Sequence, residues 1–334
     1  MKRYVRKGFA RLKNSLLGGL EKSVAETRFL MGHNAALQVR SMHTISDLGQ
    51  VEFQVWSQNG EDGIIDWLIE RLDLPVRAFV EFGVEDYGQA NTRFLLANRN
   101  WRGLIIDGSA ANVARIKSDE IYFKHDLTAV DAFIDRENIN DIIGSKFSGD
   151  VGLLSVDIDG NDYWVLESLR VIRPILLVCE YNAVFGDLYP ITVPYDPAFR
   201  RGHAHHSNLY FGMSLPALRL LAERMGYAFL GTNSTGLNAF FVRLDYAPRL
   251  DGAIGKVSSR PSLFREARDR DGKLTFTAGL LRAQQIAHMP VVDVSSGKTV
   301  TLGGLDPLYS SGWLDIILAG DDRRAVEPAP DLTR

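Results

Sequence analysis

Short apolar segments alternate with amphipathic segments along residues 57–225, and this pattern restricts the chain to an α/β fold. Short strands that are joined through helices form a parallel sheet with right-handed crossovers. The predicted strands are 78–84, 103–107, 121–125, 151–157 and 175–180. The predicted helices are 57–71, 89–98, 110–117, 129–143, 162–171 and 215–225.

Two further strands, 228–231 and 239–244, are separated only by a turn rich in Asn, Ser and Gly, so they form an antiparallel hairpin. Five parallel strands, a helix and a terminal hairpin resemble the Rossmann-like, seven-stranded, mostly parallel sheet of class I methyltransferases. We therefore predict such a domain over 51–246. Residues 1–50 form an N-terminal helical extension, and residues 247–334 form a C-terminal extension that acts as a lid or an oligomer contact.

The C-terminal extension gives weaker patterns. Segments 264–269 and 280–286 have helical periodicity, and segments 291–294 and 299–302 are typical of short strands. Nothing in them identifies a substrate.

Composition narrows the class of protein. A hydrophobic content of 46% in 334 residues excludes a largely disordered chain. The sequence has no run of about 18 apolar residues, so it predicts no transmembrane helix. The lone Cys179 and the lack of a visible signal peptide favour the reducing cytoplasm. A net charge of −3 argues against nucleic acid as the main partner.

The N-terminal segment differs in charge from the rest. Residues 1–40 hold nine Lys/Arg and two Glu, whereas the remaining 294 residues carry a balance of −10. Val5, Phe9, Leu12, Leu16 and Leu20 recur at helical spacing among these basic residues, up to the pair Gly18-Gly19. This pattern predicts a basic amphipathic helix. Two interpretations remain open: peripheral contact with the inner face of an anionic membrane, or packing on its own domain or on a second subunit of a homo-oligomer.

Polar residues at the ends of the first three predicted strands suit a nucleoside. Gly83 permits a tight turn close to a ligand, next to Glu81. Asp107 follows Gly83 by 24 residues, the spacing at which an acid accepts hydrogen bonds from ribose hydroxyls. Asp126 then accepts a hydrogen bond from an adenine amino group. The alternative is that these acids only cap the following helices.

Acids also follow the fourth and fifth predicted strands. Asp157 and Asp159 follow the fourth, and Glu180 and Asn182 the fifth. Oxygen ligands from adjacent strand ends suit Mg²⁺ or Mn²⁺, which lowers the pKa of a bound hydroxyl. The alternative is that these side chains bind backbone amides.

Three histidines, His203, His205 and His206, lie between the fifth strand and the next helix. Imidazole accepts a proton near neutral pH, so one of them is a candidate general base. The alternative is a solvated loop without a chemical role.

Taken together, the motifs resemble the FkbM-like branch of class I methyltransferases over residues 55–245. The resemblance rests on Ser57-Gln58-Asn59-Gly60-Glu61-Asp62-Gly63, Glu81-Phe82-Gly83, Asn91-Thr92, Asp157-Ile158-Asp159-Gly160-Asn161-Asp162, Glu180-Tyr181-Asn182, Gly212-Met213-Ser214 and Gly236-Leu237-Asn238. It implies S-adenosylmethionine as cofactor, held by Gln58, Glu81, Gly83, Asn91, Thr92, Asp107, Ser109, Asp126 and Asp157. The fourth-strand motif departs from the D-x-E-G-x-E that is more common in the family.

The resemblance also implies an acceptor, because many members of the family methylate oxygens of sugars. We therefore expect an S-adenosylmethionine-dependent O-methyltransferase that acts on a glycan, a glycolipid or a sugar-bearing metabolite. Its catalytic residue is Asp159 or one of the three histidines, with a metal at Asp157, Asp159, Glu180 and Asn182. Two other classes stay open: a nucleotide-sugar glycosyltransferase that uses Asp157-Ile158-Asp159 as a D-x-D motif, and a non-catalytic scaffold.

Overall fold

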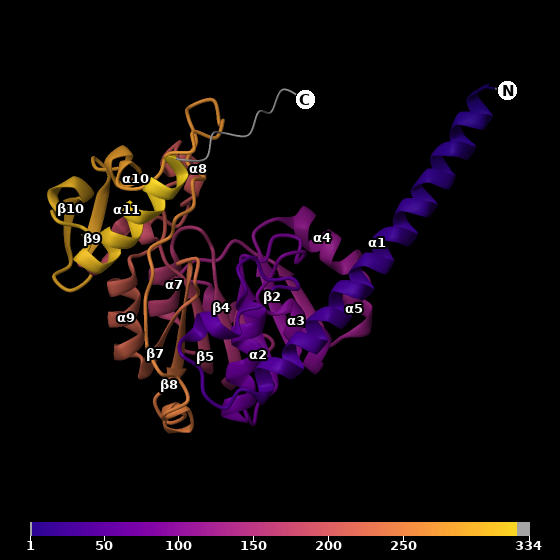
Figure 1. Cartoon of the computed structure of the whole chain (residues 1–334), viewed down its shortest axis with the longest axis horizontal. Helices are drawn as coiled ribbons and strands as arrows, with labels where there is room; N and C mark the ends of the chain where they lie inside the picture. Colours follow the sequence, from indigo (N-terminus) through magenta and orange to yellow (C-terminus); the bar gives the residue numbers. More distant parts are fainter. Residues whose placement is uncertain (1, 326–334) are drawn as a thin grey trace.

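A seven-stranded sheet forms the centre of the molecule (Figure 1). The computed structural model describes the backbone of residues 2–325 and the side chains of residues 19, 20 and 23–320. The strand order is β3-β2-β1-β4-β5-β8-β7. The strands are β1 (Ala78–Phe82), β2 (Arg102–Asp107), β3 (Leu127–Asp131), β4 (Gly149–Val156), β5 (Ile172–Glu180), β7 (Tyr227–Thr232) and β8 (Asn238–Arg243). Within this sheet, only the β5–β8 and β8–β7 pairs are antiparallel, which confirms the predicted class I methyltransferase fold.

Helices cover both faces of this sheet, because alternate strand residues point to opposite sides. On one face Phe79 packs in a core with α2 (Glu61–Leu72), α3 (Arg93–Arg99) and α4 (Ala110–Ser118). On the other face Val80 and Phe82 pack in a core with α6 (Ile139–Gly144), α7 (Asp162–Ser168) and α9 (Leu215–Arg224). Cys179 is buried in the second core.

One strand was misplaced by the sequence analysis. Residues 121–125 are not a strand: they lie in the short helix α5 (Glu120–Lys124), which begins where the Asp119 side chain accepts a hydrogen bond from Ile121 N at 2.9 Å. The third strand is β3, so the predicted helix 129–143 is also wrong in its first part and shrinks to α6. Because β3 begins at Leu127, Asp126 stands before the strand and not at its carboxyl end.

The first helix is longer than predicted. α1 (Lys2–Ser41) continues through Gly18-Gly19. Its C-terminal part packs on α2, and Arg40 donates to both carboxylate oxygens of Asp66 at 2.8 and 2.9 Å. The amphipathic pattern predicted for Val5 to Leu16 concerns side chains outside the described residues. Within the described part of the chain, no helix is long and apolar enough to cross a membrane.

The C-terminal extension folds against the segment that follows β5. β9 (Pro290–Asp293) pairs with β10 (Lys298–Thr301) and with β6 (Ile191–Thr192), and α10 (Leu281–Gln285) and α11 (Ser311–Ala325) complete the extension. The predicted strands 291–294 and 299–302 and the helix 280–286 are thus confirmed within one or two residues. The predicted helix 264–269 is wrong, because this segment is irregular and Arg268 forms a bridge with Leu274.

Candidate functional site

The turn after β1 brings two strand ends into direct contact. Gly83 has a φ of +69°, and a Cβ at this position would lie 1.5 Å from the carbonyl oxygen of Asp157. Only glycine permits this approach, because any side chain would push β1 and β4 apart. The turn therefore fixes Asp157 beside the predicted cofactor loop.

The loop after β4 is held by its own last acid. The carboxylate of Asp162 accepts hydrogen bonds from Ile158 N at 2.8 Å and from Gly160 N at 2.9 Å. Asp159 adopts a left-handed φ of +55°, which is uncommon for a residue with a side chain. Within the sequence D-I-D-G-N-D, Asp162 therefore stabilises the loop, whereas the side chains of Asp157 and Asp159 border the cleft.

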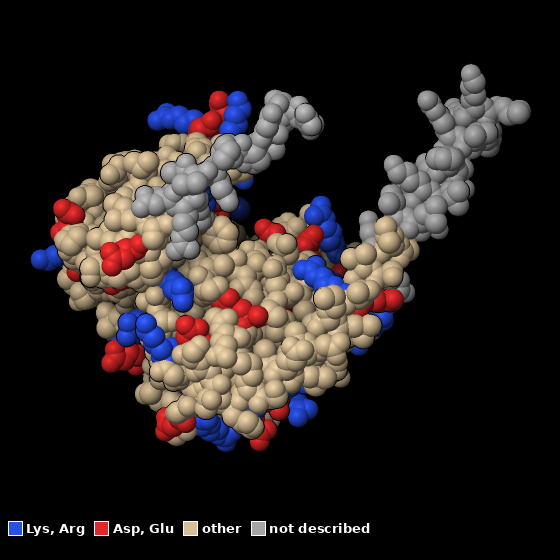
Figure 2. Space-filling model, viewed as in Figure 1, with Lys and Arg blue, Asp and Glu red and all other residues tan. Residues whose placement is uncertain are grey.

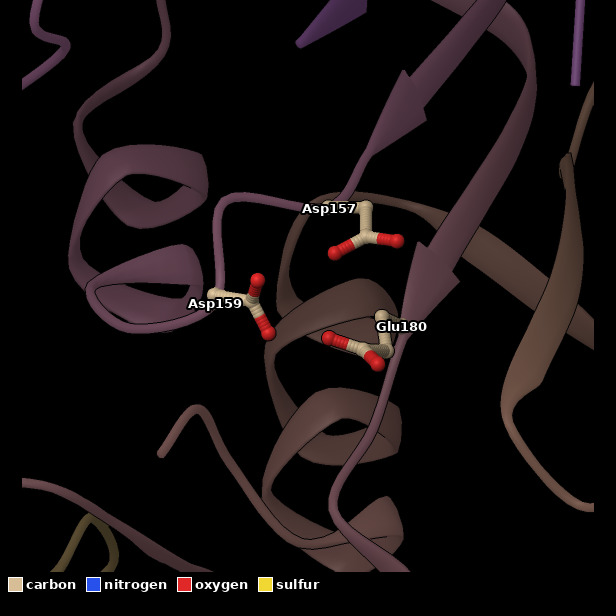
Figure 3. A group of neighbouring side chains, drawn as sticks. All are labelled: Asp157, Asp159 and Glu180. Carbon is tan, nitrogen blue, oxygen red and sulfur yellow. The ribbon is translucent and has the colours of Figure 1, made fainter. Parts of the chain in front are cut away.

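Asp157, Asp159 and Glu180 form one group, which we call the cleft acids. Figure 3 shows their carboxyl groups facing one another from the ends of β4 and β5. One oxygen of each lies within 4.8 Å of the others. Burial, and then repulsion by the neighbouring acids, raise the pKa values of Asp157 and Glu180 well above their usual range. Oxygens at this separation can share a proton or coordinate a divalent cation.

A guanidinium group balances part of this charge. Arg201, in the short helix α8 (Arg201–Ala204), donates to Asp159 Oδ1 at 2.6 Å and to Glu266 Oε1 at 2.7 Å. Its Nε donates to the carbonyl of Asn208 at 2.7 Å, and its guanidinium carbon lies 3.8 Å from the centroid of the Phe211 ring. Arg201 thus connects the cleft acids to the C-terminal extension through Glu266.

Two hollows meet at the cleft acids, and Figure 2 shows this edge of the molecule indented between the C-terminal extension and the part that carries α4. The first, of about 260 Å³, is bordered by Gly83, Asp107, Ser109, Phe133 and Asp157, among others. The second, of about 230 Å³, is bordered mainly by polar side chains: Gln58, Asn59, Glu81, Glu85, Gln89, Asn91, Asp157, Asp159, Glu180, Arg201, Asn238 and Glu266. Both lie at the carboxyl edge of the parallel strands, where α/β sheets bind their ligands.

Most of the predicted cofactor residues border these hollows, namely Gln58, Glu81, Gly83, Asn91, Asp107, Ser109 and Asp157. Thr92 stands behind them, and its hydroxyl donates to Glu81 at 2.5 Å. Asp107 Oδ1 accepts from Ser109 N at 2.9 Å and from Asn112 Nδ2 at 3.1 Å, so it both shapes the turn before α4 and borders the first hollow.

Asp126 does not reach the site. It precedes β3, its carbonyl accepts from Gly103 N at the start of β2, and its carboxylate lies 3.4 Å from Lys146 Nζ. These contacts place it at the opposite edge of the sheet. The adenine contact expected for Asp126 was therefore wrong, because it depended on the misplaced third strand.

The side chain of Asn182 is also occupied by hydrogen bonds to the backbone. Its Nδ2 donates to the carbonyls of Leu209 and Phe211 at 2.9 and 3.0 Å, and its Oδ1 accepts from Val184 N at 3.0 Å. The metal-binding role predicted for Asn182 was wrong, because the side chain instead holds the segment 209–211 in place. Among the His, Cys, Asp and Glu side chains of the described residues, the group that could hold a metal ion comprises the cleft acids.

The three histidines lie outside both hollows. His203 is exposed on α8. His205 Nδ1 lies 2.7 Å from Ser207 Oγ, and its ring centroid lies 4.3 Å from that of His206 and 5.4 Å from that of His288. Burial and the nearby His206, His288 and Arg270 lower the pKa of His205. The structure does not bring these histidines to the cleft acids, so it gives no support to their role as general base.

A second group of acids lies next to the cleft acids, and we call Glu61, Asp62 and Glu81 the supporting acids; of these, Glu81 also borders the second hollow. Asp62 Oδ2 accepts from three backbone amides, those of Val55, Trp56 and Ser57, at 2.7 to 2.9 Å. Glu81 accepts from the amides of Asn91 and Thr92 at 2.8 and 3.1 Å. Glu61 Oε1 accepts from Asn233 Nδ2 and Asn238 Nδ2, both at 2.8 Å. Burial raises the pKa of Asp62 to about 6 and that of Glu81 to about 7.

Several residues that border the second hollow were not predicted as site residues, among them Arg201, Glu266 and Asn238. Asn238 is 6% exposed, and its Oδ1 has no hydrogen-bond partner among the described residues. It belongs to the motif Gly236-Leu237-Asn238, which was noted without a role. Arg201 lies two residues before His203, one of the three candidate general bases. Glu266 lies in an extension without a recognisable motif.

A larger hollow, of about 610 Å³, lies between α9 and β7 and is bordered by Leu215, Arg219, Glu223, Tyr227, Phe229 and Phe241, among others. None of the predicted site residues borders it. Volume alone does not mark this hollow as the functional site, because it is remote from the strand ends that carry the cleft acids.

Comparisons with known proteins bear on the fold alone. No protein-family model and no curated protein matches the chain. Among solved structures, the O-methyltransferase from Bacillus cereus in complex with SAH is similar at 14% identity, over 63% of this chain and 89% of that one, with a TM-score of 0.37. A putative O-methyltransferase from Klebsiella pneumoniae is similar at 12% identity, over 66% and 90%, with the same TM-score.

Other similar structures are matched over less of their length. An O-methyltransferase family protein from Burkholderia thailandensis shares 14% identity over 55% of this chain and 59% of that one, with a TM-score of 0.33. The chain spans 52% of the citrinin polyketide synthase CMeT domain. Likenesses this remote carry no argument about substrate or metal.

Proposed function

We propose that the protein is an S-adenosylmethionine-dependent O-methyltransferase whose acceptor is a hydroxyl group of a sugar-bearing molecule. One observation carries the proposal: the glycine turn after β1, Asp107 after β2 and the cleft acids after β4 and β5 border two adjoining hollows that share Gly83, Asp157 and Asp159. This arrangement supports a nucleoside cofactor in the first hollow, with the reacting groups next to the cleft acids.

The residues of the first hollow fit the cofactor. Gly83 leaves room that a Cβ would fill, and Asp107 offers a carboxylate to ribose hydroxyls. In the second hollow, Asn238 Oδ1 is a buried acceptor to which no described residue donates a hydrogen bond, which suits the ammonium group of the methionine part. When bound, S-adenosylmethionine supplies an electrophilic methyl group for an acceptor oxygen.

The cleft acids would take the proton that the acceptor hydroxyl loses. Carboxylates at a shared site have raised pKa values, which favours proton uptake near neutral pH. The same three oxygens also suit Mg²⁺ or Mn²⁺, which when bound lowers the pKa of a coordinated hydroxyl. Arg201 would hold Asp159 in position in either case.

The polar border of the second hollow favours a polyhydroxylated acceptor. Gln58, Asn59 and Gln89 offer amide donors and acceptors, and Glu85 and Glu266 offer carboxylates. Side chains of this kind bind several hydroxyl groups at once, as a sugar ring requires. This is the basis for proposing a glycan or a sugar-bearing metabolite as substrate.

Calorimetry with S-adenosylhomocysteine tests the cofactor directly. We expect saturable binding to the full chain at a stoichiometry near one, and the absence of binding to folded protein would refute the proposal. The metal is tested separately, by methyl transfer to sugar acceptors before and after treatment with a chelator. Unchanged turnover would remove the metal and leave the carboxylates as the base.

The glycosyltransferase alternative is tested by the effect of ligands on the melting temperature. In that class Asp157 and Asp159 would hold a metal on a nucleotide diphosphate. A rise in melting temperature with uridine diphosphate sugars, together with none for S-adenosylhomocysteine, would favour it over methyl transfer.

A further inference from the structure

α1 presents two different faces along its described part. Toward the body, the ring of Phe29 lies 5.8 Å from that of Trp56 and 6.3 Å from that of Phe94, and Ala36 and Val39 are buried. This face attaches the helix to the domain.

The other face is apolar and exposed. Leu20, Val24 and Met31 are 62%, 58% and 68% exposed, and Thr27 lies between them. At about 100° per residue these four side chains fall within an arc of about 60°, on the side away from Phe29. In Figure 2 the described part of α1 that rises above the body is largely uncharged.

A groove of about 540 Å³ extends this face. It is bordered by Val24, Thr27, Met31 and Phe53 and is mainly apolar, with Arg28 at its margin. Large hydrophobic side chains that are contiguous and exposed mark an interaction surface. We call the face made by Leu20, Val24, Thr27 and Met31 the outer stripe.

The spacing of the outer stripe differs from that of a left-handed coiled coil. In the sequence the same spacing runs back through Leu16, Leu12, Phe9 and Val5, so these positions, with the polar Thr27 among them, recur on average every ~3.7 residues from Val5 to Met31. A left-handed coiled coil needs a period of 3.5 residues. Within the described residues, the outer stripe stays within the arc of about 60° given above, as a helix that lies on a flat surface requires.

The charge of the N-terminal segment also favours a bilayer over a second copy of the helix. The first 40 residues carry nine Lys/Arg against two Glu, and a second copy of this helix would bring like charges together. A flat apolar surface with negative charge at its margin is an anionic lipid bilayer. We propose that α1 lies on such a bilayer through its outer stripe and thereby holds the domain at the membrane surface.

Sedimentation with vesicles tests this proposal independently of methyl transfer. We expect the full chain to sediment with vesicles of equal parts phosphatidylcholine and phosphatidylglycerol, to stay in solution with phosphatidylcholine alone, and to be released by added salt. Equal sedimentation with both vesicles, or with neither, would overturn the proposal.

A matched pair of variants locates the contact. Leu20→Ser, Val24→Ser and Met31→Ser together should weaken vesicle binding roughly tenfold or more, because three large side chains no longer enter the lipid. The control, Leu274→Ser, Phe276→Ser and Leu281→Ser, removes three exposed hydrophobic side chains from the C-terminal extension and should bind like the wild type. Equal loss in both variants would contradict the assignment.

All these substitutions are at exposed positions, so circular dichroism should show unchanged helicity.

Analytical ultracentrifugation distinguishes binding to a bilayer from binding to a second copy of the chain. A concentration-dependent dimer that the outer-stripe variant abolishes would assign this face to self-association and overturn the membrane proposal. A monomer at all concentrations supports it.

Discussion

The cleft acids and the supporting acids are similar in composition and opposite in environment. Asp62 and Glu81 accept hydrogen bonds from backbone amides, so these carboxylates hold the local fold, although Glu81 also borders the second hollow. Asp157 and Glu180 face each other and a third acid, with Arg201 as the nearby cation. An acid that accepts from backbone amides stabilises the local fold, whereas acids that repel one another need a ligand or a proton.

The largest expected effect is on the cleft acids. Replacing Asp157 by Asn, or Glu180 by Gln, should lower the rate of methyl transfer by about 10²- to 10⁴-fold, because the proton of the acceptor loses its base. The melting temperature should not fall, since one of three repelling carboxylates is removed. The rate with a sugar acceptor and a thermal melt check both statements, with Asp126→Asn as a control at the opposite edge of the sheet. A destabilised variant would show that these acids belong to the fold after all.

The supporting acids should show the reverse pattern. Asp62→Ala leaves three backbone amides without their acceptor and should lower the free energy of unfolding by roughly 2–4 kcal/mol, as measured by urea denaturation. Asp62→Asn keeps one acceptor oxygen and should lose less. If the alanine variant proved as stable as the wild type, the distinction between the two groups of acids would collapse.

The pH dependence of stability tests Glu81. Burial raises its pKa from 4.5 to about 7 in the folded protein, so the folded state holds the proton more tightly than the unfolded state. The stability contributed by the protonated form is complete below the unfolded pKa and is lost as the pH rises through the folded pKa. The stability of the wild type relative to Glu81→Gln should therefore fall between about pH 5 and about pH 8, by at most ~3 kcal/mol. A difference that does not change with pH would contradict the raised pKa.

The smallest effect distinguishes two acids at opposite edges of one sheet. Asp107→Ala should weaken the binding of S-adenosylhomocysteine by about tenfold, the size expected for one hydrogen bond to a charged group. Asp126→Ala should leave the affinity unchanged, because Asp126 pairs with Lys146 away from the cleft. Calorimetry on both variants decides, and equal losses would restore the original assignment of Asp126.

The sheet was predictable because strand periodicity and turn residues are local. Segments 78–84, 103–107 and 151–157 lie within two residues of β1, β2 and β4. The third strand was not predictable in this way, since Ile121 to His125 has the composition of a strand but begins directly after a capping aspartate, and that local hydrogen bond starts a helix.

The site was predictable only as far as strand ends determine it. Gly83, Asp107, Asp157, Asp159 and Glu180 follow from topology, because the carboxyl ends of parallel strands meet at one edge. Arg201 comes from the four-residue helix α8 and Glu266 from an irregular segment 65 residues further on, and no periodicity brings them together. Asn182 had the residue type of a ligand, but its amide is used by the backbone of residues 209–211.

The contact between Gly83 and the carbonyl of Asp157 has a thermodynamic consequence. Gly83 and Asp157 border both hollows, and the backbone of Gly83 meets the carbonyl of Asp157 with no side chain between them. In the proposed enzyme we therefore expect the cofactor and the acceptor to affect each other's binding, and by linkage each would alter the affinity of the other by the same factor.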